Sequence, residues 1–289
     1  MQNTHQLFDL AASTVVNLGN APNVVLPSYE LKLALIKVED VATADAVLLD
    51  IRSGDVIGFD TEYRHFKGPH GLTLCVVQIA TERNVFVLDM TQIQRKFAFI
   101  YTRSTILTPT AECPAQLHRI LVDPTIAKCG VGVEADAKVI WTDFGIEMLK
   151  MVDLGWMSRC AFPINYRVKA GPVSLQQCVA DMLHHDMSKD DRRTKWELGL
   201  KGTSEATQRL VHYAALDAQA GREIYFILAE AIQVTGVQRQ TVIPDDWYSY
   251  NYSAGMTTRL ERNLDGMHEK WSFTVCRWYK GNIITNFWP

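Results

Sequence analysis

The chain has 289 residues, and its 29 Lys and Arg against 32 Asp and Glu give a formal net charge of −3. This balance argues against a histone-like or otherwise polybasic protein, although a local basic cluster can still bind phosphates. Hydrophobic residues make up 47% and charged residues 21% of the chain, a globular composition that excludes global disorder. The length allows one large domain, or one domain of about 200 residues with an appendage.

The spacing of the cysteines and the N-terminal residues indicate the cellular compartment. The six cysteines lie far apart and form no C-x-x-C pair, which argues against a zinc finger or a dense disulfide framework. The opening residues, MQNTHQLFDLAAS, lack the basic and apolar regions of a signal peptide, and no run of about 18 apolar residues occurs. We therefore expect an intracellular protein, nuclear or cytoplasmic, with reduced thiols and no membrane partner.

The first elements are short. Residues 1–29 carry little pattern and are expected to form a lead-in segment. Residues 29–51 predict a short strand and then a helix, which Gly54 closes. Short β-branched and aromatic runs bounded by turn residues predict three strands, over 56–59, 72–80 and 84–88. Their close spacing predicts an antiparallel meander.

The pattern then alternates between helix and strand. Residues 91–114 lack a clean period and contain two prolines, so we expect a surface excursion there. The next predictions are a helix over 114–121, a strand over 125–129, a helix over 134–144 and a strand over 151–154. Two more helices are predicted over 174–182 and 204–234, capped by Ser174 and Ser204. The predicted fold class is α/β, with a mixed sheet in which parallel strands follow the antiparallel meander and helices flank both.

Four acids and a tyrosine are candidate site residues. Asp60 and Glu62 are two residues apart at the end of a predicted strand, so both carboxylates share one face and can reach one metal. Asp136 begins a predicted helix, and Tyr213 and Asp217, four residues apart, share one face of the last helix. Each has an ordinary structural explanation: solvated acids at a strand end, an acid at a helix N-terminus and an aromatic core residue. Their combination in this order is improbable by chance.

Carboxylates without a histidine pair or a nearby thiol suit hard divalent cations such as Mg²⁺ or Mn²⁺, and they do not suit zinc. Without a cation these acids would repel one another. Two cations about 4 Å apart would offset that repulsion and clamp the attacking and leaving oxygens of an in-line phosphoryl displacement. The pattern therefore favours the hydrolysis of nucleic acid.

Four segments of the chain resemble the motifs of the DEDDy 3′–5′ exonuclease family, most of all the subgroup with the exonuclease domain of the Werner syndrome protein. The segments are GFDTE (58–62), GVGVEAD (130–136), SLQQCVADML (174–183) and HYAALDAQAGREIY (212–225). The resemblance extends from about residue 30 to about residue 235. It implies a ribonuclease H-like fold and the stepwise release of 5′-mononucleotides from a 3′ end.

The resemblance also implies a role for each candidate residue. Asp60 is expected to bridge two divalent cations, Mg²⁺ or Mn²⁺, and Glu62 and Asp217 to hold the one that activates water. Asp136 is expected to help hold the second cation, at the leaving group. Tyr213 is expected to orient the attacking water. Because an ordinary phenol has a pKa near 10, the metal and not Tyr213 must supply most of the acidity of that water.

A basic and aromatic segment is the best candidate for phosphate binding, since the family places such a segment beside the substrate. The predicted substrate-binding residues are Arg64, Lys189, Arg192, Arg193, Lys195 and Trp196. The expected partner is nucleic acid, either a single strand or a duplex with an accessible 3′ end. The alternative is a solvated charged loop, because Asp190, Asp191 and Glu197 neutralise much of the cluster. Arg64 lies in a predicted loop over 63–71, where aromatic and basic residues can contact the terminal nucleotide.

The resemblance does not explain residues 236–289, an extension rich in Trp and Tyr. Within it, residues 271–279 and 283–288 are predicted to pair as a hairpin. We favour packing of the extension against the core over a surface for protein partners or nucleic acid. The predicted organisation is thus a lead-in segment (1–29), an exonuclease domain (30–235) and the C-terminal extension.

Two other functions fit part of the pattern. A nucleic-acid-binding or scaffold protein with this fold could have lost catalysis, although the presence of all four acids and Tyr213 counts against it. The run from Gly130 through Gly132 to Ala135, with Asp153 about 20 residues later, matches a dinucleotide-binding fingerprint. That motif lies in mid-domain and leaves the other acids unexplained.

Overall fold

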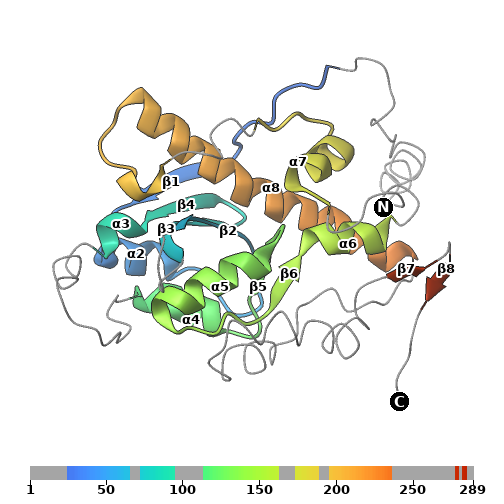
Figure 1. The fold of residues 1–289 in the computed structure, drawn as a ribbon, viewed down its shortest axis with the longest axis horizontal. Helices are drawn as coiled ribbons and strands as arrows, with labels where there is room; N and C mark the ends of the chain where they lie inside the picture. Colours follow the sequence, from blue (N-terminus) through green and yellow to red (C-terminus); the bar gives the residue numbers. More distant parts are fainter. Residues whose placement is uncertain are drawn as a thin grey trace.

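A computed structural model of the chain describes residues 25–65, 72–94, 113–162, 173–188, 195–235, 277–279 and 282–284. Its centre is a six-stranded mixed sheet in the order β1-β4-β3-β2-β5-β6, with helices on both faces (Figure 1). None of the described helices is long and apolar enough to span a bilayer.

The sheet contains the predicted meander. Strands β2 (Val56–His65), β3 (Leu72–Ala80) and β4 (Asn84–Asp89) pair antiparallel in chain order. Strands β5 (Ala127–Gly130) and β6 (Met151–Asp153) then add parallel to β2. The prediction of a mixed sheet is confirmed. The prediction placed parallel strands only after the meander, whereas in the structure the first strand of the chain also pairs parallel. Strand β1 (Ala34–Val38) lies at the far edge and pairs parallel with β4, a long-range contact that leaves no local period in the sequence.

Strand β2 is longer than predicted. Its antiparallel pairing with β3 continues past the two acids, to Arg64 opposite Thr73 and His65 opposite Leu72. The register shifts between Glu62 and Tyr63, where β3 bulges at Cys75. Asp60 and Glu62 therefore lie inside a strand and not at its end, and Arg64 belongs to the strand and not to a loop.

The helices form an apolar layer on each face of the sheet. Helices α2 (Val41–Leu48), α4 (Ala115–Val122) and α5 (Val133–Phe144) pack on one face, against a core that includes Phe59 and Ile79. Helix α8 (Glu205–Thr235) crosses the other face, where Val76 and Val87 are buried beneath it. The predicted helices are confirmed, with boundaries shifted by one or two residues.

Two short helices that were not predicted follow strand ends directly. In α3 (Met90–Ile93) the Asp89 carboxylate accepts hydrogen bonds from the backbone N–H groups of Thr91 and Gln92. In α6 (Leu154–Ala161) the Asp153 carboxylate accepts from the N–H of Trp156. Each aspartate ends a buried strand and caps the following helix, so the change of structure occurs without a turn signal.

The helix predicted from Ser174 onward divides in two. It begins as α7 (Leu175–Cys178) and continues as a π-helical turn, η3 (Val179–Leu183). Ser174 caps it as predicted, by accepting a hydrogen bond from the N–H of Gln177. The chain then reaches a short 3-10 helix, η5 (Trp196–Leu198), before α8.

Several predictions fall largely outside the described residues: the lead-in segment, the excursion over 91–114 and most of the extension over 236–289. Within the extension, β7 (Arg277–Tyr279) pairs antiparallel with β8 (Asn282–Ile284), as the predicted hairpin requires.

Candidate active site

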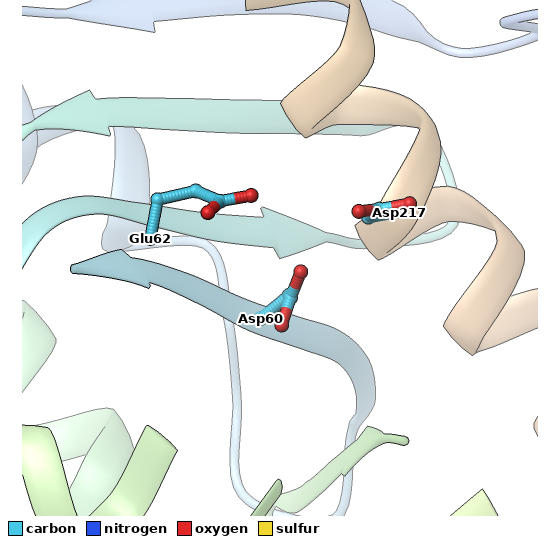
Figure 2. A group of neighbouring side chains, drawn as sticks. All are labelled: Asp60, Glu62 and Asp217. Atoms are coloured by element: carbon cyan, nitrogen blue, oxygen red, sulfur yellow. The ribbon is translucent and has the colours of Figure 1, made fainter. Parts of the chain in front are cut away.

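Three of the four predicted acids meet on the face of the sheet that α8 covers. Asp60 and Glu62 point to the same side of β2 because alternate residues of a strand share a face, and Asp217 reaches them from α8 (Figure 2). Each residue offers a carboxylate oxygen, and these oxygens all lie within 4.8 Å of one another. Asp217 is buried, and the other two acids are half-buried. A partly buried set of donors made only of oxygens fits a hard divalent cation such as Mg²⁺ or Mn²⁺.

The close approach of α8 to β2 depends on small residues. A Cβ added to Gly58 would lie 1.9 Å from the backbone oxygen of Ala218, so only glycine fits there. One turn further along α8, a Cβ at Gly221 would lie 3.2 Å from the backbone oxygen of Cys129. The glycine two residues before Asp60 therefore allows the helix to bring Asp217 to the strand.

Tyr213 lies one turn before Asp217 on α8 and is 7% exposed. Burial raises the pKa of its phenol above the ordinary value, and the negative charges of Asp217 and Glu62 raise it further, with a side-chain hydrogen bond to Asp217. The hydroxyl therefore keeps its proton at neutral pH. Its ring packs against that of Trp196, with the centroids 6.2 Å apart and the planes tilted by 34°.

The fourth acid, Asp136, lies on the other face of β2. It is buried in the first turn of α5, where its Oδ1 accepts a hydrogen bond of 2.6 Å from the Thr61 hydroxyl. Burial raises the pKa of this carboxyl to about 7. Among the described residues, the group of converging carboxylates does not include Asp136. Asp136 contacts β2 through Thr61, which lies between Asp60 and Glu62. The role of Asp136 as a metal ligand stays a prediction.

Comparison with known protein families shows to which family the chain belongs. A family described as 3′-5′ exonuclease matches residues 35–233, well over half of the chain, and this span contains all four acids and Tyr213. The chain belongs to this 3′-5′ exonuclease family. Membership confirms the resemblance found in the motifs.

A mouse relative, the bifunctional 3′-5′ exonuclease/ATP-dependent helicase WRN, is 25% identical over 207 residues. The match spans 71% of this exonuclease-family chain and 12% of the mouse protein. The chain thus corresponds to a small part of that relative.

Solved structures share the fold. The EXO domain of Aedes aegypti Nibbler has a TM-score of 0.56 at 18% identity, covering 73% of this chain and 95% of its own. The catalytic core of RRP6 from Trypanosoma brucei has a TM-score of 0.53 at 18% identity, covering 81% of this chain and 57% of its own. Brucella melitensis NrnC has a TM-score of 0.52 at 20% identity, covering 83% and 96%. The sheet and its helices are therefore a ribonuclease H-like fold.

Half of the predicted substrate-binding set lies in the described part of this exonuclease fold. Lys189, Arg192 and Arg193 lie outside the described residues. Lys195 is exposed at the start of η5, next to Trp196. Trp196 is 3% exposed, so its ring is a packing partner of Tyr213 and not an open surface.

Arg64 also lies near this segment. Its Nη1 forms an ion pair with Glu197, at 3.0 Å from Oε1. Glu197 is one of the acids expected to neutralise the basic cluster, and in the structure it pairs with Arg64 on β2. Substrate contact by Arg64, Lys195 or Trp196 stays a prediction.

The residues that match the dinucleotide-binding fingerprint make structural contacts in this exonuclease. The Asp153 carboxylate accepts hydrogen bonds from the N–H groups of Gly132, at 2.9 Å, and Trp156, at 3.1 Å. A Cβ at Gly130 would lie 2.4 Å from the backbone oxygen of Phe59, so this glycine is required by strand packing. These contacts, together with the family match, argue against dinucleotide binding.

One residue beside the site was missed. Gln78 lies fully buried on β3, directly opposite Asp60. In the sequence it is the single amide within the otherwise apolar end of the run LTLCVVQIA, whose pattern predicts a strand and no site residue. A polar side chain at a fully buried strand position is the signal that could have identified it.

Proposed function

We propose that this protein is a metal-dependent 3′–5′ exonuclease that hydrolyses phosphodiester bonds of nucleic acid from the 3′ end and releases 5′-mononucleotides. The observation that carries the proposal is the convergence of Asp60, Glu62 and Asp217 with the Tyr213 hydroxyl one helical turn away. A catalytically silent binding protein would have no need to keep three repelling carboxylates together. That alternative is therefore less well supported.

The carboxylates are the proposed ligands of two divalent cations, Mg²⁺ or Mn²⁺. Asp60, Glu62 and Asp217, whose carboxylate oxygens converge, would hold one cation. The family resemblance assigns Asp136, with Asp60, to the second cation, and for that role the Asp136 carboxylate would have to leave the Thr61 hydroxyl. Bound there, the cations would lower the pKa of the attacking water and stabilise the charge on the leaving oxygen. Brucella melitensis NrnC, which shares the fold, has been solved with bound Mg²⁺ and bound to pGG, in keeping with this proposal.

Tyr213 would orient the nucleophile. In the metal-free site the raised pKa of its phenol leaves the hydroxyl protonated at neutral pH. We assign to this hydroxyl the hydrogen bond that orients the attacking water. The packing of its ring against Trp196 restricts where the hydroxyl can lie. A buried and fixed donor contributes orientation, which is a large part of the rate advantage in hydrolytic sites.

The substrate would be a single strand, or a duplex with an accessible 3′ end, bound through its phosphates. The proposed phosphate-binding residues are Arg64, Lys189, Arg192, Arg193 and Lys195, with Trp196 at the end of this segment. Arginine and lysine are the side chains that supply most phosphate contacts in nucleic-acid complexes. Because such contacts displace counterions, KM should rise with salt concentration.

The test is a polarity assay on 5′-labelled DNA and RNA, single-stranded and duplex, with Mg²⁺, Mn²⁺ or EDTA. We expect the labelled strands to shorten one nucleotide at a time with either metal and to stay intact in EDTA. Asp217→Asn, which keeps the shape of the side chain and removes its charge, is the matched control and should be inactive. Degradation that persists in EDTA, or that begins at the 5′ end, would overturn the proposal.

A further inference from the structure

Gln78 is a buried amide at the centre of the sheet. It is 0% exposed and lies on β3 in antiparallel register with Asp60. Its neighbours along the strand on the same face, Val76 and Ala80, are apolar and fully buried. Burying an amide is unfavourable unless its N–H groups and oxygen find partners. The partners of Gln78 therefore indicate why the chain places an amide there.

The partner of Gln78 is the first acid of the site. In the amide orientation that satisfies its hydrogen-bond network, Nε2 donates to the backbone oxygen of Asp60 at 3.1 Å and to Asp60 Oδ2 at 3.2 Å. The Gln78 amide thus donates to both the backbone oxygen and the carboxylate of Asp60. A carboxylate has about four lone-pair sites, so this donor leaves positions for a cation.

We propose that Gln78 is a positioning residue, which holds the Asp60 carboxylate in the orientation that turns it toward Glu62 and Asp217. Figure 2 shows one oxygen of Asp60 turned toward those two side chains. The inference rests on the proposed function, since it assigns a role to Gln78 in the affinity for the divalent cation. Hydrogen bonds that orient a ligand without touching the metal affect metal affinity strongly.

The neutrality of the amide supports this role. A lysine or arginine in the same place would form an ion pair with Asp60 and offset the charge that attracts a cation. An apolar residue would leave the Asp60 carboxylate without this donor. Glutamine orients the carboxylate by donating a hydrogen bond while the negative charge stays available.

The chain offers a matched control in Gln219, which is also 0% exposed. Its Oε1 accepts from the N–H groups of Lys32 and Leu33, and its Nε2 donates to the Tyr29 hydroxyl. These contacts fasten the segment before β1 to α8. Gln219 is therefore a buried amide with a structural role, against which Gln78 can be compared.

The experiment measures Mn²⁺ binding without nucleic acid, by electron paramagnetic resonance, for the full chain and for Gln78→Met and Gln219→Met. Circular dichroism establishes that each variant is folded at the temperature used. We expect Gln78→Met to bind Mn²⁺ about 10-fold or more weakly than wild type, and Gln219→Met to stay within about twofold despite a lower Tm. Equal Mn²⁺ affinity of Gln78→Met and wild type would overturn the inference, and so would an equal loss in both variants.

A second variant keeps the test informative if Gln78→Met does not fold. Gln78→Asn retains the amide but withdraws it by one methylene from Asp60, and the same loss of Mn²⁺ affinity is expected. Retained wild-type affinity in Gln78→Asn would then overturn the inference. Failure of the proposed function has a different signature, because in that case the wild-type chain itself would bind no Mn²⁺.

Discussion

The chemistry of Tyr213 depends on its burial and on the carboxylates beside it. Because burial and the adjacent carboxylates raise its pKa, the hydroxyl stays protonated, and Tyr213→Phe removes that hydroxyl while the ring remains against Trp196. We expect kcat to fall by roughly 10²-fold or more, as for the loss of an orienting group, with little change in Kd for nucleic acid. Single-turnover kinetics on a labelled strand, with Tm as the folding control, measure this. Wild-type turnover in this variant would show that Tyr213 is only a core aromatic.

Asp143 gives a prediction about pH that is independent of the site. This half-buried carboxylate on α5 accepts a hydrogen bond from the N–H of Leu74, and burial raises its pKa from 3.8 to about 6. Since the folded pKa lies above the unfolded one, the folded state binds the proton more tightly. The stability that this proton confers is complete below about pH 4 and is lost as the pH rises through 6.

Asp143→Asn removes this titration and keeps an oxygen that can accept from Leu74. We expect the variant to be more stable than wild type at pH 8, by on the order of 1–2 kcal/mol, and to gain less at pH 4. Urea unfolding of both proteins at the two pH values measures the difference. A gain that does not depend on pH would show that the charge of Asp143 is not its cause.

At the scale of elements, the contact between α8 and β2 determines whether the site forms. The Cβ of Gly58→Ala would meet the backbone oxygen of Ala218 at 1.9 Å, and a helix backbone cannot move as a flexible side chain does. We expect α8 to shift, with a loss of about 1–3 kcal/mol in the free energy of unfolding and weaker Mn²⁺ binding as Asp217 moves away.

Gly221→Ala is the graded control for this prediction. Its Cβ would lie 3.2 Å from the backbone oxygen of Cys129, a much milder overlap in the same interface. Chemical denaturation and Mn²⁺ titration should therefore show a smaller effect than for Gly58→Ala. A Gly58→Ala protein with wild-type stability and metal binding would mean that the helix does not depend on this close approach.

At the scale of the whole molecule, metal binding and folding are coupled through the acids. The carboxylates of Asp60, Glu62 and Asp217 repel one another in the metal-free protein, and a cation that binds only the folded chain stabilises it. Mg²⁺ or Mn²⁺ should therefore raise Tm, and EDTA should reverse the change. Thermal unfolding over a range of metal concentrations measures the effect.

Asp60→Ala and Asp217→Ala test the same coupling. Each variant should lose cleavage and the metal-dependent rise in Tm but stay folded. Its metal-free Tm should lie close to that of the wild type, since the relief of carboxylate repulsion offsets the hydrogen bond from Gln78 or Tyr213 that the substitution removes. Circular dichroism checks the fold. Variants found unfolded would show that these acids are structural.

The sequence by itself determined the elements whose signals are local. The β-branched and aromatic runs of the meander, the long helix α8 and the caps at Ser174 and Ser204 depend on side chains within a few residues of one another. The shared faces of Asp60 with Glu62, and of Tyr213 with Asp217, follow from the strand and helix periods alone. The motifs built on these residues were therefore sufficient to indicate the family before any contact was known.

Only the tertiary structure decided how those residues meet. Asp217 and Asp60 are separated by more than half of the chain, and they meet because Gly58 lets α8 pack close to β2. Asp136 instead accepts a hydrogen bond from Thr61 on the other side of the sheet. The position of Gln78 opposite Asp60 likewise follows from the register of β3 on β2. The approach of a helix to a strand is set by packing between distant segments, which leaves no periodic trace in the local sequence. Strand register depends in addition on the turn that joins the two strands, here outside the described residues.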